Sequence, residues 1–169
     1  MHKRIGSRIP AALATLALAV LAGCSGGGSS DGVTVNGDVA VAYVKRSTKL
    51  TMNPTDGTNS VPGGDLIVRE KASPAAAEHN ITASITQGKG DASDPEVSYD
   101  GKKIAFALKC PADNTSTIDG GPACTGRWNI WEYDTSTGGL AGGTLRRVTN
   151  STEFDDVDPA YLPGGGFVF

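Results

Sequence analysis

The feature that most constrains the fold of this chain is an internal repeat. Three pairs of segments recur in the same order: VAYVKR and IAFALK (residues 41–46 and 104–109), DLIVRE and NIWEYD (65–70 and 129–134), and NIT and RVT (80–82 and 147–149). The copies lie 63, 64 and 67 residues apart, and a third copy of the first segment begins with VF at residues 168–169. A repeat of this length predicts stacked units that bury their apolar faces against one another.

Each copy predicts short β-strands. The segments IAFAL and NIWEYD are rich in β-branched, aromatic and other apolar residues, and turn residues flank them. Asp100-Gly101 is a hairpin signal, and the stretch 134–139 is a second turn that ends in two glycines. No segment after residue 24 keeps a helical apolar period over three turns. One complete unit is therefore expected to hold four strands, at residues 96–98, 103–108, 129–133 and 145–149.

These segments resemble the WD-like β-propeller repeat of the TolB type. The resemblance rests on DPEVSYDGKKIAF (residues 94–106), followed by NIWEYD and RRVT. Val97 and Tyr99 stand where the family pattern has Trp and Pro, and residues 110–124 are an insertion. More narrowly, VAYVKR, GDLIVREKASPAAAEHNITA and GRWNIWEYD are similar to the propeller region of exported bacterial proteins like the hydrazine synthase alpha subunit.

The resemblance implies an all-β chain made of four-stranded antiparallel blades of a β-propeller. Residues 38–90 would form a first blade, residues 91–153 a second, and residues 154–169 the start of a third. Closure takes at least four blades, or about 250 residues at this period. We therefore expect an incomplete propeller that is the N-terminal part of a larger one.

The N-terminus predicts export and a lipid anchor. Residues 1–8 carry three basic side chains, and residues 11–22 form an unbroken apolar run of 12 residues, too short to span a bilayer. The run ends in LAGC, which resembles the bacterial lipobox. Residues 1–23 would then be a lipoprotein signal peptide, Cys24 the lipidated residue, and 24–37 a Gly/Ser-rich tether. An ordinary signal peptide with a chance cysteine is the alternative.

Location and redox chemistry follow from this expectation. Ser25, rather than Asp, follows Cys24 and favours the outer membrane, with the protein facing the periplasm. In that oxidising compartment, Cys110 and Cys124 form an even pair and predict a structural disulfide. Without its signal, the chain has a net charge of −6, because the signal removes three of 15 basic residues and none of 18 acidic ones. Nucleic acid is therefore not an expected partner.

Two acidic clusters are the candidate metal ligands. Asp91 and Asp94 lie in DASDPE, and Asp155 and Asp158 lie in EFDDVDP. Carboxylates at such spacing are able to bind Ca²⁺, but the EF-hand spacing and its loop glycine are missing. An Asp-Pro placed just before a strand also suits a turn cap that accepts backbone N–H groups. The cap is the preferred interpretation, so no metal is predicted.

No catalytic residue or cofactor is predicted for this chain. His79 is the one histidine after the signal, DTSTG lacks the first glycine of a nucleophile elbow, and no C-x-x-C-H occurs. Trp128, at the edge of its strand beside Arg127, is the candidate ligand contact, while Trp131 and Tyr133 are expected to pack in the core.

Two functions remain open. The first is a non-catalytic, lipid-anchored binding or scaffold module that contacts an envelope protein or a glycan. The second is the propeller part of a haem-containing periplasmic redox protein similar to the hydrazine synthase alpha subunit. The second requires C-x-x-C-H in a continuation beyond Phe169.

Overall fold

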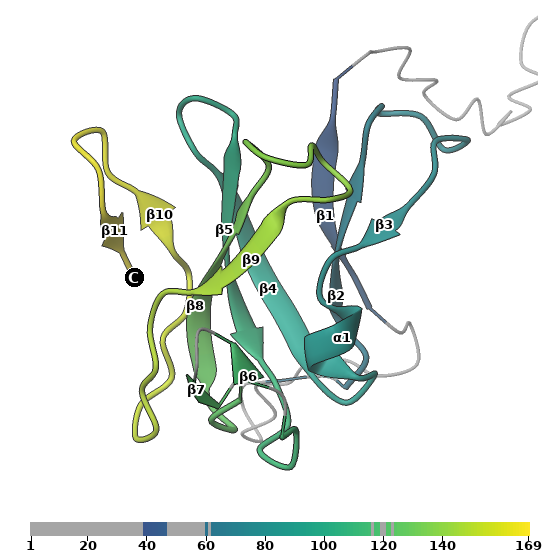
Figure 1. The fold of residues 1–169 in the computed structure, drawn as a ribbon. Coiled ribbons are helices and arrows are strands. Elements are labelled where there is room, and N and C mark those ends of the chain that lie inside the picture. The colour runs from purple at the N-terminus through teal and green to yellow at the C-terminus, as the bar shows by residue number, and fades with distance from the viewer. Residues whose placement is uncertain (1–38, 47–59, 61, 116, 119–120, 123) are drawn as a thin grey trace, which may run out of the picture. The chain divides into compact units, whose positions relative to one another are not determined.

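The described part of the chain is built from antiparallel sheets. The computed structural model describes residues 39–46, 60, 62–115, 117–118, 121–122 and 124–169. Within these residues, the one helix is the single turn α1 (Ala83–Thr86) (Figure 1). This confirms the all-β expectation. The predicted signal peptide, Cys24 and the tether up to residue 37 lie outside the described residues.

The central sheet has four strands in the order β4-β5-β8-β9 (Figure 1). Its strands are β4 (Asp91–Val97), β5 (Lys103–Lys109), β8 (Trp128–Asp134) and β9 (Thr144–Arg147). All neighbouring pairs are antiparallel. The four strands expected for one repeat are therefore present and adjacent.

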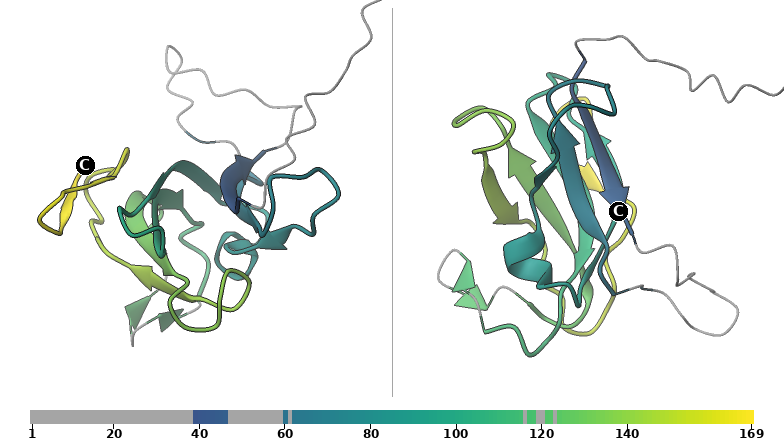
Figure 2. Two further views of the ribbon diagram at one scale, coloured as in Figure 1. Left: turned by 90° about the horizontal axis from the view of Figure 1, so that it is seen from above. Right: turned by 90° about the vertical axis from the view of Figure 1, so that its right-hand side faces the viewer.

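A first sheet and two small hairpins complete the described structure. The first sheet has the order β1-β2-β3, with β1 (Val41–Lys45), β2 (Asp65–Arg69) and β3 (His79–Asn80). One hairpin pairs β10 (Ala160–Tyr161) with β11 (Phe167–Val168), and the other pairs β6 (Thr117–Ile118) with β7 (Gly121–Pro122). The views of Figures 1 and 2 agree that the central sheet lies between the first sheet and the β10–β11 hairpin.

The sequence repeat is also a repeat of strand register. In β1 and β2, Tyr43 pairs with Ile67, and in β5 and β8 the residues 63 and 64 positions later, Phe106 and Trp131, form the same pair. The next pairing recurs too, since Ile67↔Asn80 in β2 and β3 corresponds to Trp131↔Arg147 in β8 and β9. The three strands of the first sheet thus correspond to the last three strands of the central sheet.

A threonine closes each copy with the same hydrogen bond. The backbone N–H of Leu66 donates to Oγ1 of Thr82 over 3.0 Å, and the N–H of Ile130 donates to Oγ1 of Thr149 over 2.9 Å. Both threonines come from the recurring NIT and RVT segments. Each hydroxyl continues the pairing beyond the end of the last strand, where the backbone of β2 or β8 would otherwise lack an acceptor.

The repeated Asp-Pro has an unusual backbone conformation in both copies. Asp94 and Asp158 have φ angles of 51° and 54°, in the left-handed region that Asp tolerates better than most residues. In β4, the register shifts between Ser93 and Glu96, so Asp94 and Pro95 form a β-bulge. The strand therefore continues through the proline and begins at Asp91, five residues before the predicted start.

The main core fills the space between the two sheets. Leu66 and Val68 of β2 pack in one cluster with Phe106 of β5 and Trp131 of β8. Cys110 and Cys124 belong to this cluster and form a disulfide with a Cα–Cα distance of 5.3 Å. The predicted disulfide is therefore confirmed.

An ion pair joins the first sheet to the start of β4. Nε of Arg46, next to β1, donates to Oδ1 of the buried Asp91 over 2.8 Å. Gly64, just before β2, lies so close that a Cβ there would come within 1.9 Å of the same oxygen. The absence of a side chain at residue 64 therefore lets the Asp91 carboxylate sit against the first sheet.

Candidate functional site

The candidate site is centred on a buried carboxylate in β8. Side chains alternate between the two faces of this strand, so Trp131 and Tyr133 enter the main core while Glu132 points to the opposite face. Glu132 is only 3% exposed. A buried carboxylate needs partners that satisfy its charge and its hydrogen bonds.

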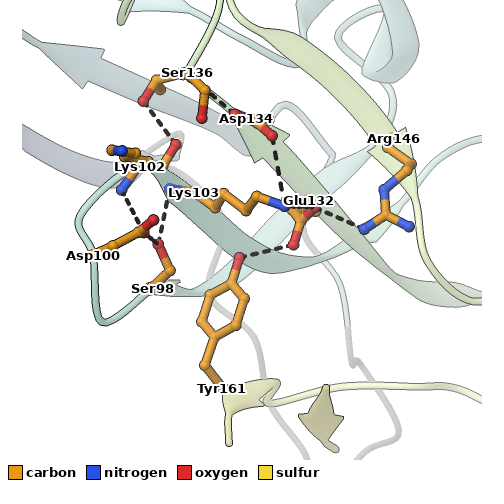
Figure 3. A network of polar contacts seen from close by, with 10 residues as sticks. Ser98, Asp100, Lys102, Lys103, Glu132, Asp134, Ser136, Arg146 and Tyr161 are labelled. Carbon is orange, nitrogen blue, oxygen red and sulfur yellow. Dashed lines mark hydrogen bonds and ion pairs between the residues drawn. The ribbon is translucent and has the colours of Figure 1, made fainter. Parts of the chain in front are cut away.

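Glu132 receives these partners from three other strands (Figure 3). Nη2 of Arg146 in β9 lies 2.7 Å from Oε1, and Nζ of Lys103 in β5 lies 3.4 Å from the same oxygen. The phenol of Tyr161 in β10 donates to Oε2 over 3.1 Å. One carboxylate therefore ties the hairpin β10–β11 to two strands of the central sheet.

Tyr161 is held as a hydrogen-bond donor. Burial raises the pKa of its phenol well above the ordinary value, and the negative charge of Glu132 and the hydrogen bond to it raise the pKa further. Its ring centroid lies 4.8 Å from that of Phe167 in β11. The phenol therefore stays protonated, and its ring packs within the hairpin.

The β4–β5 turn beside Glu132 is fixed by a second set of contacts (Figure 3). The hydroxyl of Ser98 donates to Oδ1 of Asp100 over 2.7 Å, and the N–H of Lys102 donates to the same oxygen over 3.1 Å. These hydrogen bonds, with that of Ser98 the stronger cause, lower the pKa of Asp100. The Ser98 hydroxyl also accepts from the N–H of Lys103 over 2.9 Å. The turn thus presents a fixed edge to the site.

A hollow of about 580 Å³ opens next to this network. Its walls come from the central sheet and from the hairpin, and they include Lys103, Glu132 and Arg146 on one side and Tyr161, Leu162 and Phe167 on the other. Tyr99 also lines it and is 75% exposed. The hollow therefore combines a charged floor with an aromatic and aliphatic rim, which suits contact with a partner and offers no nucleophile paired with a base.

A separate charged cluster lies on the first sheet. Glu78 accepts hydrogen bonds from Nζ of Lys45 over 2.6 Å and from the hydroxyl of Tyr43 over 2.7 Å, and it also pairs with Arg69. These three hydrogen bonds, with that of Lys45 the strongest, lower the pKa of Glu78 to about 2. The cluster fixes the loop between β2 and β3 against both strands.

The predicted ligand contacts lie at the start of β8, away from the hollow. Trp128 is 3% exposed and packs with Ala107 and Ile130 in a second apolar cluster. Arg127 is exposed, and its guanidinium lies 4.0 Å from the carboxylate of Asp155. A ligand role for Trp128 and Arg127 stays a prediction.

The four candidate metal ligands are placed at junctions between sheets. Asp91 pairs with Arg46, while Oδ1 of Asp155 accepts the backbone N–H of Trp128 over 3.1 Å. Asp94 and Asp158 occupy the two left-handed positions described above. In the described ranges, no three side chains of His, Cys, Asp or Glu come together in a way that could hold a metal ion.

The network around Glu132 was missed by the sequence analysis. Its signal is present, because Glu132 is the one charged residue inside the strongly apolar segment WNIWEY. A charge in such a strand predicts a partnered carboxylate. The identity of Arg146 and Tyr161 as partners depends on the sheet order and on the placement of a hairpin 29 residues away.

Comparison of the chain with models of protein families, with curated proteins and with solved structures found no significant match. Among the residues that the structure describes, no helix is long and apolar enough to cross a membrane. The fold and the site define the protein as an all-β chain of antiparallel sheets with a repeated strand register.

Proposed function

We propose that this chain is a binding or scaffold module built from β-propeller blades. It is held at the outer membrane by a lipid on Cys24 and faces the periplasm, where it contacts an envelope protein or a glycan. The hollow beside Glu132 is its contact surface.

The observation that carries the proposal is the preserved register of the two sheets. A four-stranded antiparallel meander is the architecture of a propeller blade, and the central sheet has that order. The first sheet repeats three of its strands in the same register, and core side chains pack between the two. Repeated sheets that pack face to face support the propeller.

The contact surface is supported by the side chains around the hollow. Tyr99 and Leu162 are exposed apolar residues that line it, and Val168 and Phe169 at the hairpin are exposed as well. Exposed apolar groups gathered beside polar ones mark interaction sites. The contacts of Glu132 hold both walls in one arrangement, which lowers the ordering cost of binding.

Cross-linking in the intact envelope tests the contact surface. A photoreactive phenylalanine analogue at position 99 is expected to give one discrete adduct with a partner. The matched control carries the analogue at Thr137, an exposed residue in the β8–β9 turn. The same adducts from both positions, or none from position 99, would argue against a contact surface at the hollow.

Fractionation tests the anchor. The wild-type chain should sediment with membranes, and the Cys24→Ser variant should appear in the soluble periplasmic fraction. A variant that stays with the membranes would remove the lipid from the proposal. A haem absorbance band in the purified native complex would instead favour the redox protein named above.

A further inference from the structure

We propose that the free edge of β11 accepts an antiparallel β-strand from a partner polypeptide. The added strand carries large apolar side chains at alternate positions, at least one of them Tyr or Trp, and these fill the hollow beside Glu132. This inference rests on the proposed function and deepens it by naming the segment of the partner that binds.

The first step is that the hairpin copies the beginning of the central sheet. Two cross-strand pairs recur: Glu96↔Ala105 as Ala160↔Val168, and Val97↔Ile104 as Tyr161↔Phe167. A hydrogen bond recurs with them, since Ser98 N–H donates to the carbonyl of Lys103 over 2.9 Å, and Leu162 N–H donates to that of Gly166 over 3.1 Å. In register and hydrogen bonding, β10 and β11 therefore correspond to β4 and the start of β5.

The second step is that β11 has a free edge where β5 has a partner. All seven residues of β5 pair with β8, whereas β11 pairs with β10 and with no other strand in the described part of the chain. Antiparallel partners alternate between hydrogen-bonded and non-hydrogen-bonded pairs. Because Leu162 and Gly166 are bonded, Phe167 points its N–H and carbonyl away from β10, as does the N–H of Phe169.

The third step is that the register fixes where the new side chains go. A residue opposite Phe167 takes the place that Tyr133 has in the central sheet, and a residue opposite Phe169 takes the place of Trp131. Tyr133 and Trp131 are buried against β2, where they pack in one cluster with Val68. Glu132 is the counterpart of Val68, 64 residues later, and it lines the hollow. The new side chains therefore point at the hollow.

The chemistry of the hollow selects the side chains. Its rim is apolar, but its floor holds Glu132 and Arg146. A wholly aliphatic side chain would cover these charged groups without offering a hydrogen bond. Tyr and Trp combine a large apolar surface with one polar group, so they suit such a site. Main-chain pairing along an exposed edge supplies the remaining affinity.

A labelled peptide tests the inference. The probe is a fluorescein-labelled peptide with the sequence GRWNIWEYD (residues 126–134), which is the strand that pairs with β5 in this chain. Its anisotropy is titrated with the full chain. The control peptide has the same composition in an order that places the aromatic residues side by side. Saturable binding of the first peptide and at least about tenfold weaker binding of the control are expected.

A pair of variants tests the edge itself. Phe169→Pro removes an N–H that points to the added strand, while Phe169→Ala keeps that N–H and removes the ring. The proline variant should bind the peptide about tenfold more weakly than the alanine variant. Equal thermal unfolding of the two variants shows that the fold is unchanged. Equal peptide binding by the two would overturn the inference.

The result separates this inference from the proposed function. If the peptide fails to bind while position 99 still cross-links to one partner, the contact surface stands and strand addition is wrong. Sedimentation addresses a second copy as the occupant. A concentration-dependent dimer that Phe169→Pro abolishes and Phe169→Ala retains would overturn the assignment of the edge to a partner of different sequence.

Discussion

Tyr161 and Glu132 are joined by a hydrogen bond of 3.1 Å that connects the β10–β11 hairpin to the central sheet. The hairpin has two strands of two residues each, and such a hairpin has little stability of its own. Its position therefore depends on contacts with β8, and this hydrogen bond is one of them. The wall of the hollow that the hairpin provides depends on the same contact.

The first prediction concerns this pair. Tyr161→Phe should lower the free energy of unfolding by about 1–2 kcal/mol and Glu132→Gln by about 1–3 kcal/mol, because a hydrogen bond to a charged group is lost or weakened. The double variant should lose less than the sum of the two. Urea unfolding of all four proteins measures the coupling. Tyr99→Phe, in the exposed ring of the same hollow, is the matched control and should change stability by less than about 0.5 kcal/mol. Additive losses would contradict a direct interaction.

The second prediction concerns the paired threonines. Thr149→Val leaves the N–H of Ile130 without its acceptor, which should cost about 1–2 kcal/mol of unfolding free energy. Thr82→Val should cost more, about 2–3 kcal/mol, because the hydroxyl of Thr82 also donates to Asp65 over 2.8 Å. Thr152→Val, at an exposed position, serves as the control. The reverse order of the first two losses would show that the two copies do not use their threonines in the same way.

The third prediction concerns acid stability. The pKa of Glu78 falls from 4.5 to about 2 on folding, so the ionised form is favoured in the folded state. Its contribution is fully present above pH 4.5 and is lost as the pH falls towards 2. Wild-type protein should therefore be more stable than Glu78→Gln at neutral pH, and the difference should vanish near pH 2. Denaturant titrations across this range measure it. Glu70→Gln, at an exposed residue just after β2, should show no such convergence.

The fourth prediction concerns the disulfide. Cys110 and Cys124 close a loop of 15 residues, counting both ends, and a loop of that size corresponds to about 3 kcal/mol of stabilisation. Replacing both cysteines with alanine should lower the free energy of unfolding by about this amount. Reduction of the wild-type protein should have a similar effect. If the reductant also destabilises the double-alanine variant, the effect does not come from the disulfide.

The strands were largely predictable from the sequence, because pairs such as Phe106↔Trp131 follow from the repeat. Two boundaries were not. β4 begins earlier than predicted because Asp94 adopts a left-handed conformation, which lets the strand pass through Pro95 as a bulge. β9 ends at Arg147, since Thr149 reaches β8 through its side chain. Both depend on backbone conformations that local sequence patterns specify poorly.

The candidate site was harder to predict than the strands. Alternation along β8 places Glu132 opposite to Trp131, but it does not say which residues surround the carboxylate. Arg146 comes from the neighbouring strand and Tyr161 from a separate hairpin, so both contacts require the assembled structure. Trp128 drew attention as an aromatic residue at a strand edge, yet it packs beneath the chain that leads to Asp155.

The matched threonines imply that sheet formation and contact specificity are separable in this protein. Thr82 and Thr149 make the same bond in both copies, whereas Val68 and Glu132 differ although they occupy corresponding positions. The groups that pair a strand with its neighbours are retained, while those that face the next sheet vary. A duplicated unit of this kind acquires new recognition properties by exchanging side chains on one face, without any change to how its own sheet assembles.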